Sequence, residues 1–262
     1  MALRQPDMTE EEGDGRVVEV EERVRKKGKK KEEEEEWGRD PLEVFGTDLM
    51  LRILNKLDAR SVALSSLVSR PWHLVASSDT LWSLKCEELW SGKAHIPRMS
   101  QVDGLSKFAA YSLSVMDGKR TRITKYDLSD HAWEFHFSKV HGFHHLLPRH
   151  VLLAAPEYWR NLDPYWKGTG RPMRRYFHLD GSQSADPGDK VWGGHECCYC
   201  TVTSSLEDGK IREHYVRINR WPRLCVSRRQ DWSWEMKNYL CSYSSIRDTD
   251  KPGGTGPLFP VM

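Results

Sequence analysis

The stretch Thr47-Asp-Leu-Met-Leu-Arg-Ile-Leu-Asn-Lys-Leu57 carries the clearest helical periodicity of this 262-residue chain. Its apolar residues recur at helical spacing, which places them on one wide stripe along a helix. Thr47 or Asp48 can accept hydrogen bonds from the free amides at the start of that helix. The pattern therefore predicts an amphipathic helix that begins near residue 47.

Two further helical segments are predicted directly after it. Residues 58–61 have the composition of a turn, and the apolar residues between 62 and 68 indicate a second helix of about two turns. Ser69-Arg70-Pro71 fits the start of a third helix, because proline is tolerated where its missing amide has no helical partner. The apolar pattern continues through residue 89, so we expect a three-helix module at residues 40–90.

Three segments of this module resemble the F-box, a family of small helical domains. The family pattern runs Leu-Pro-x-Asp/Glu-Leu-Leu-x-x-Ile-Leu-x-x-Leu, then Val-Cys-Lys-x-Trp, and ends in Leu-Trp. The segments at 45–57, 67–72 and 76–82 follow it in the right order and at the right separations, although Phe45-Gly46 replaces Leu-Pro and Val68-Ser69-Arg70 replaces Val-Cys-Lys. An F-box followed by a distinct second half also resembles plant F-box proteins with short β-rich tails.

The F-box resemblance implies a non-catalytic role in a ubiquitin ligase. The family binds the Skp adaptor of a cullin-RING ligase and recruits a protein substrate, while other subunits transfer ubiquitin. A helical unit this small has too little interior to bury every apolar side chain, so some are expected to face a partner. By family position, the adaptor contacts would be made by Phe45, Leu49, Met50, Ile53, Leu54, Leu57, Val62, Leu67, Trp72 and Trp82.

Residues 1–36 have the composition of a disordered charged tail. They contain no aromatic residue and carry thirteen acidic against nine basic side chains, a net charge of −4. Such a segment cannot bury enough apolar surface to offset the entropy lost on ordering. The basic block at 23–31 is interpreted either as a nuclear-localisation signal or as a solvated segment beside five glutamates. We expect a protein of the nucleus, the cytoplasm or both.

Residues 126–246 change to a β-rich pattern. Strands are predicted at 131–139, 173–178, 199–203, 211–218, 224–227, 232–236 and 240–244, separated by turn residues. Glu207-Asp-Gly-Lys210 indicates a hairpin. Short strands at this spacing favour an antiparallel sandwich or barrel, which makes the protein α+β. Residues 91–125 are predicted to be a connector with a short helix near 105–113, and residues 247–262 a flexible tail.

The second half is rich in aromatic residues, with 19 of the 27 in the chain lying between Tyr126 and Tyr243. Most are expected to fill the core and the strand faces. Tyr and Trp also suit recognition surfaces, since they offer large contact areas at little rotamer cost. Residues 155–170 are too rich in turn formers for a long helix or strand and are predicted to form an ordered loop. The candidate substrate-recognition residues are Tyr158, Trp159, Tyr165, Trp166, Trp192 and Trp221.

Charge and hydropathy exclude two classes of partner. The formal charge of +2 is weak for a nucleic-acid binder. Without the tail, residues 37–262 carry +6, which leaves room for a modestly acidic protein substrate. No apolar run approaches the roughly 20 residues needed to span a bilayer, so no membrane partner is expected.

Neither a metal site, a cofactor nor a catalytic centre is predicted. The six cysteines are expected to be reduced thiols. His141, His144, His145 and His150 do not supply the paired knuckles of a zinc site, and neither does the cluster at 195–200. The common motifs of nucleophile elbows, phosphate loops and zinc proteases are missing. Residues 140–153 interrupt the strand pattern, which suggests an insertion.

Three functions remain open on the sequence. The first is an F-box substrate receptor whose β-rich part binds a target protein. The second is an F-box-linked module that binds a glycan or another small ligand on exposed aromatic rings. The third is a β-barrel enzyme in which the helical resemblance is incidental.

Overall fold

The structure is a computed structural model that describes Arg25 and residues 39–138, 155–192, 199–205, 211–218 and 223–260. It divides into two compact units, Met1–Ala76 and Ser77–Met262, each of which is described by itself. Apart from Arg25, the predicted tail at 1–36 lies outside the described residues. So do Trp221 and the whole of the predicted insertion at 140–153.

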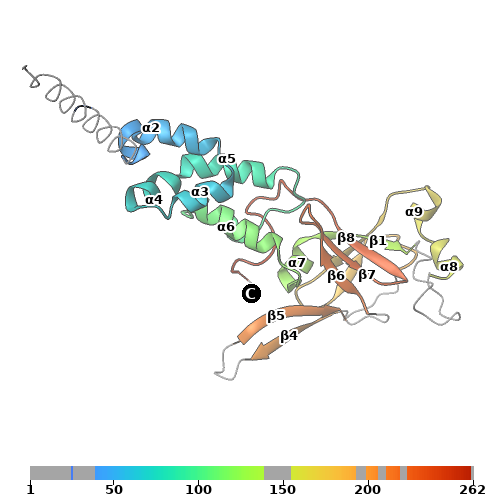
Figure 1. Ribbon diagram of the computed structural model, residues 1–262. Coiled ribbons are helices and arrows are strands. Elements are labelled where there is room, and N and C mark those ends of the chain that lie inside the picture. The colour runs from blue at the N-terminus through green and yellow to red at the C-terminus, as the bar shows by residue number, and fades with distance from the viewer. Residues whose placement is uncertain are drawn as a thin grey trace, which may run out of the picture. The chain divides into compact units, whose positions relative to one another are not determined.

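The described part of unit 1 is helical, with α2 (Pro41–Asn55), α3 (Ala59–Ser65) and α4 (Arg70–Ala76) in sequence (Figure 1). The first two predicted helices are confirmed, as is the start of the third. The apolar pattern that continues through residue 89 is divided between this third helix and a fourth, so residues 40–90 contain four helices instead of the predicted three. The third helix ends at Ala76, and a separate helix, α5 (Asp79–Trp90), follows in unit 2 because Ser78 adopts extended backbone angles.

The start of α2 differs from the prediction. The helix begins at Pro41 rather than near residue 47, and it is kinked at Gly46, whose φ of 71° is strained for any other residue type. Asp40 caps this end by accepting a hydrogen bond from the Leu42 amide at 2.9 Å. The Trp72 indole donates a second hydrogen bond to the same carboxylate at 2.7 Å, which joins α4 to the start of α2.

Unit 2 begins with a helical layer. Its helices are α5, η1 (Arg98–Ser100), α6 (Lys107–Gly118) and α7 (Lys125–Asp130), and α6 corresponds to the short helix predicted near 105–113. Helices α5 and α6 pack through Trp82, whose ring lies 4.6 Å from that of Phe108 and 5.0 Å from that of Tyr111. None of the described helices is long and apolar enough to cross a bilayer.

The strands form two antiparallel sheets. The larger has the order β3-β2-β1-β8-β7-β6. The smaller is the hairpin β4-β5, whose two strands are labelled in Figure 1. Their bounds are β1 (Ala132–Phe137), β2 (Met173–Phe177), β3 (Gln183–Ala185), β4 (Tyr199–Ser205), β5 (Ile211–Ile218), β6 (Cys225–Arg228), β7 (Trp234–Lys237) and β8 (Cys241–Ser245). The antiparallel domain is confirmed, and β3 is an unpredicted short edge strand. The larger sheet stays open between its edges β3 and β6 rather than closing into a barrel.

One face of the larger sheet carries the hydrophobic core. Alternate residues of β1, namely Trp133, Phe135 and Phe137, are buried, and Tyr243 on the neighbouring β8 packs edge-on against Phe135 at 5.0 Å. The opposite residues of β1 are only half-buried. This two-residue alternation is the pattern of a sheet with one face packed on a core.

The C-terminal segment is packed against unit 2, so the prediction of a flexible tail is wrong for its described part. The Asp248 amide donates to the Ala94 carbonyl at 2.9 Å, and the Thr255 amide donates to the Ile96 carbonyl at 2.9 Å. Gly254 has a φ of 70°, and a side chain there would lie 2.7 Å from the Ile96 carbonyl oxygen. The segment's many glycines and prolines suggest flexibility in the sequence, but here they permit a close backbone approach.

Candidate functional site

Unit 1 exposes apolar side chains along one side of α2. Leu49 and Ile53 on α2, and Leu57 two residues after its end, recur every four residues and are each about 40% exposed, and we call them the α2 apolar stripe. Phe45 at the kink and Leu67 after α3 are still more exposed, the latter at 78%. These five residues are among the predicted adaptor contacts, and they are available to a partner.

The other five predicted contacts are not open surface. Met50, Leu54 and Val62 are buried, and Leu54 is only 1% exposed. Trp82 is buried in unit 2 against α6. Trp72 is half-buried, and its indole donates a hydrogen bond to Asp40. Their side chains therefore stabilise the units themselves.

Four further exposed apolar residues of unit 1 were not predicted as contacts. They lie on or shortly after its short helices, and they could have been found only by separating the inward face of each helix from the outward one. Within the described part of unit 1 they are Val44, Leu64, Val68 and Leu74.

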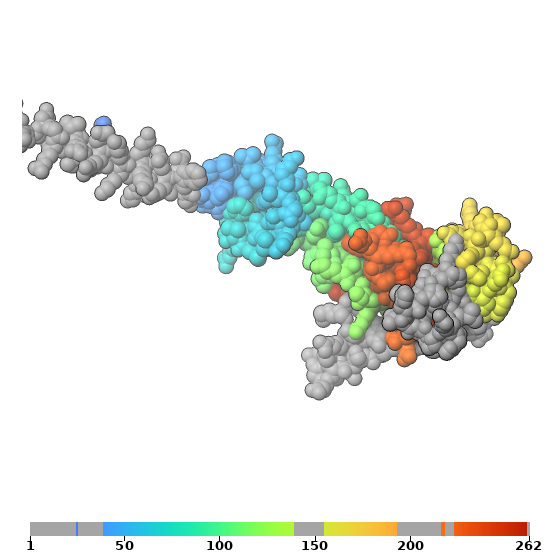
Figure 2. Space-filling view, turned by 45° about the vertical axis from the view of Figure 1, so that its right-hand side comes forward, coloured from blue at the N-terminus to red at the C-terminus, as the bar shows by residue number. Residues whose placement is uncertain are grey.

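The predicted ordered loop in unit 2 presents three of its aromatic rings. It contains two single-turn helices, α8 (Glu157–Arg160) and α9 (Pro164–Lys167). Tyr158 is 63% exposed, and Trp159 and Tyr165 are also exposed. In Figure 2 this stretch, drawn in yellow, lies at the molecular surface. The loop is therefore placed where it can contact a partner.

A buried carboxylate holds this loop against the sheet. Asp163 is fully buried, and it accepts hydrogen bonds from the Phe137 amide at 3.1 Å and the Tyr165 amide at 3.0 Å. The Trp166 indole donates to the Phe137 carbonyl at 3.0 Å. These bonds tie α9 to the end of β1, so the exposed rings project from a fixed backbone.

The remaining aromatic candidates are less available. Trp166 and Trp192 are half-buried, the former packed against the core and the latter beneath the Arg175 guanidinium at 5.3 Å. Trp221 lies outside the described residues. Stacking of a glycan would therefore depend on Trp159 and the two exposed tyrosines.

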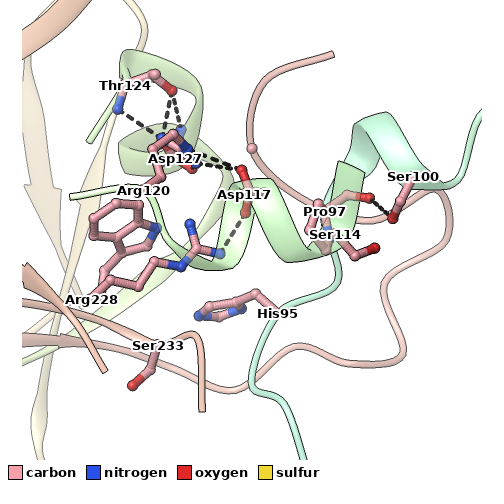
Figure 3. A network of polar contacts seen from close by, with 12 residues as sticks. His95, Pro97, Ser100, Ser114, Asp117, Arg120, Thr124, Asp127, Arg228 and Ser233 are labelled. Atoms are coloured by element: carbon pink, nitrogen blue, oxygen red, sulfur yellow. Dashed lines mark hydrogen bonds and ion pairs between the residues drawn. The ribbon is translucent and has the colours of Figure 1, made fainter. Parts of the chain in front are cut away.

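A buried polar network joins the helical layer of unit 2 to its sheet (Figure 3). Arg120 donates two hydrogen bonds of 2.7 Å to the two oxygens of Asp127 and a third, of 3.0 Å, to Asp117. Arg228 on β6 pairs with the other oxygen of Asp117 at 2.7 Å. The four charged groups are at most 6% exposed, so α6, α7 and β6 are fixed to one another.

The protonation states of this network suit a structural role. Burial alone would raise the pKa of Asp127, but hydrogen bonds and the charge of Arg120 hold that pKa below its usual value. Burial opposes the charge on Arg120 as well, yet Asp127 and Asp117 raise the pKa of Arg120 above its usual value. Neither group can exchange a proton near neutral pH, so the pair is a poor general acid or base.

Two stacked histidines lie beside this network. The rings of His95 and His131 are 3.8 Å apart, and His95 Nε2 shares a hydrogen bond of 2.7 Å with the Ser245 hydroxyl. Burial lowers the pKa of His95 to about 4, with Arg228 adding to the effect, and burial lowers the pKa of His131 well below 6.5. Both rings are therefore neutral at pH 7.

Acidification is expected to destabilise unit 2 through this pair. Between pH 6.5 and pH 4 the unfolded chain binds a proton at residue 95 that the folded chain does not, so stability falls as the pH falls through this window. From pH 7 to pH 5, His95 alone should remove about 2 kcal/mol from the free energy of unfolding. Urea unfolding at both pH values measures this loss. His95→Gln should make it smaller and the exposed-site control His178→Gln should not; equal losses in both variants would contradict the assignment.

The described residues bring no three His, Cys, Asp or Glu side chains together as a metal site would. The four histidines at 141–150 lie outside the described residues. The same holds for His195, Cys197 and Cys198, and of Cys200 only the backbone, in β4, is described.

Comparison with known proteins identifies one domain. Residues 47–88 match a family model described as F-box-like, which spans most of α2, all of α3 and α4, and most of α5. The F-box resemblance of the sequence is thereby confirmed. No solved structure gives a significant match to the chain.

Proposed function

We propose that this protein is a substrate-recognition subunit of a Skp-cullin-F-box ubiquitin ligase. The F-box-like match at 47–88 carries the proposal, since domains of this family generally bind the Skp adaptor. Unit 2 binds the target protein, and other subunits of the ligase transfer the ubiquitin. Such a complex acts in the nucleus, the cytoplasm or both.

The α2 apolar stripe supports the adaptor contact. Its three side chains lie within the matched residues and remain exposed in the free chain. Interfaces gain most of their binding energy from a few apolar or aromatic residues that become buried at their centre. The stripe, with Phe45 and Leu67, has the composition of such a centre.

Aspartate substitutions in the stripe test this proposal. Leu49→Asp and Ile53→Asp should each weaken binding to purified Skp adaptor by about tenfold or more, because each buries a carboxylate in an apolar interface. The measurement is a pull-down followed by calorimetric titration with the full chain. Leu54→Asp would not serve, since its buried side chain supports the fold.

The matched control is Leu179→Asp, at an exposed apolar position of unit 2. It adds the same charge to the surface but should leave adaptor binding unchanged. Undiminished binding by both Leu49→Asp and Ile53→Asp would overturn the assignment of the stripe, and failure of the wild-type chain to bind the adaptor would overturn the proposed function.

A further inference from the structure

A groove of about 560 Å³ lies between the aromatic loop and the β2–β3 hairpin of unit 2. Its walls are the residues around α9, the start of β2, and the turn that follows β3. Its volume falls in the range of about 300–1,000 Å³ that is typical of ligand sites. We call it the α9–β2 groove, and its charged lining residues are Lys167, Arg171, Arg174, Asp186, Asp189 and Lys190.

The two carboxylates of the groove already have partners. Asp189 forms a buried ion pair with Arg175 and accepts hydrogen bonds from the amides of Val191 and Trp192. Asp186 accepts a hydrogen bond of 2.8 Å from the Tyr176 hydroxyl. Their charge is thus largely used within the protein, and the positive side chains dominate the groove.

The four basic side chains are exposed and turned to a common concavity. Arg174 interacts with the Tyr176 hydroxyl. Among the described residues, Lys167, Arg171 and Lys190 have no hydrogen bond or ion pair. Cations gathered around one concave site produce a stronger local potential than the same cations scattered over a convex surface.

The walls that carry these charges have a fixed backbone. The hydrogen bonds to Asp163 described above hold α9 against β1. Gly168, whose φ is 64°, ends α9, and its amide donates a hydrogen bond to the Tyr165 carbonyl. The Arg175–Asp189 pair fixes the turn after β3 to β2. A site with fixed walls loses less conformational entropy on binding.

Apolar side chains border the groove on the side of the aromatic loop. Leu162 lines it and is 43% exposed, and the exposed Tyr158 and Tyr165 lie in the same loop. A ligand with carboxylates next to an apolar side chain would match both parts of the surface. A polypeptide offers this combination.

We propose that the α9–β2 groove binds an acidic segment of a partner protein, with Lys167, Arg171, Arg174 and Lys190 facing its carboxylates. The inference rests on the proposed function, because that partner would be the ligase target. A nucleic acid fits less well, since the chain's formal charge of +2 is weak for a nucleic-acid binder.

Fluorescence anisotropy with the full chain tests the groove. The probe is a fluorescein-labelled Glu-Glu-Leu-Glu-Glu peptide, and the same peptide with glutamine in place of glutamate is the neutral comparison. Lys167→Glu combined with Arg171→Glu should weaken binding of the acidic probe by about tenfold or more and reduce its salt dependence. The neutral peptide should bind poorly to every form of the protein.

The matched control is Arg217→Glu combined with Arg223→Glu, which reverses two exposed arginines at a different basic hollow of unit 2. This double variant carries the same net charge and should keep the affinity of the wild type. Equal weakening in both double variants would show attraction by overall charge and would overturn the proposal. Tighter binding of a single-stranded oligonucleotide through Lys167 and Arg171 would also overturn it.

Adaptor binding separates this inference from the proposed function. The Lys167→Glu/Arg171→Glu variant should bind the Skp adaptor like the wild type, whereas Ile53→Asp should lose the adaptor and still bind the acidic peptide. If the wild type binds the adaptor but not the acidic peptide, the proposed groove is refuted and the adaptor role stands. If the wild type binds the acidic peptide but not the adaptor, the ligase role is refuted and a peptide-binding groove remains.

Discussion

Asp127→Ala is expected to lower the free energy of unfolding of unit 2 by about 3–5 kcal/mol, the usual cost of removing one partner from a buried ion pair. The substitution leaves the buried guanidinium of Arg120 without its two 2.7 Å hydrogen bonds. It also removes the capping box at the start of α7, where Asp127 accepts from the Thr124 amide at 2.7 Å. Lost ion pairing and lost capping act in the same direction.

Urea unfolding of the full chain, followed by far-UV circular dichroism, measures this loss. Asp103→Ala is the control, because Asp103 is an exposed carboxylate outside the network. It should change the free energy of unfolding by no more than about 0.5 kcal/mol. A loss below about 1 kcal/mol for Asp127→Ala would mean that water replaces the missing partner and that the network is not as dry as its burial indicates.

Trp234→Ala should destabilise unit 2 by a similar amount, about 3–5 kcal/mol, since it empties a large volume from a close-packed core. The Trp234 side chain is fully buried. The guanidinium carbons of Arg228 and Arg120 lie 4.6 Å and 5.1 Å from the centre of its ring, so two buried cations lose an aromatic face as well. The loss therefore combines a cavity with two weakened cation–π contacts.

A conservative variant and a surface variant make this prediction specific. Trp234→Phe keeps an aromatic face for both arginines and should cost markedly less than alanine. Tyr158→Ala removes a large ring from the exposed loop and should have little effect on stability. Chemical denaturation of all three variants gives the comparison, and equal losses for Trp234→Ala and Trp234→Phe would refute the role of the aromatic face.

The strands could be predicted well because one face of the larger sheet is buried and the other is not. The alternation of Trp133, Phe135 and Phe137 with half-buried residues is visible in the sequence and fixes the strand. The edge strand β3, of Gln183–Ala185, was missed because it is too short and too polar to show such alternation. The apolar pattern from residue 70 to residue 89 shows the opposite failure, since it spans two helices and did not reveal the break between α4 and α5.

The candidate sites were predictable by residue type but not by exposure. The periodicity of α2 selects Ile53 and Leu54 equally, although 40% of the first side chain is exposed and the second is buried. The basic groove had no signal in the sequence, because Lys167 and Lys190 come from separate segments that only folding brings to one concavity. Aromatic content singled out the loop at residues 155–170, but it did not reveal the basic side chains that line the groove beside it.

Local patterns of apolar residues determine the order of helices and strands, the F-box-like segment and the one-sided sheet. These patterns can be read from the sequence because the period of a helix or a strand assigns each residue to a face by its position along the chain. The tertiary structure alone decided which apolar residues stay exposed, and it alone paired Asp127 with Arg120 and Asp117 with Arg228. Burial and ion pairing depend on segments distant in the chain. The sequence lists these side chains, whereas only the packed fold determines which of them meet.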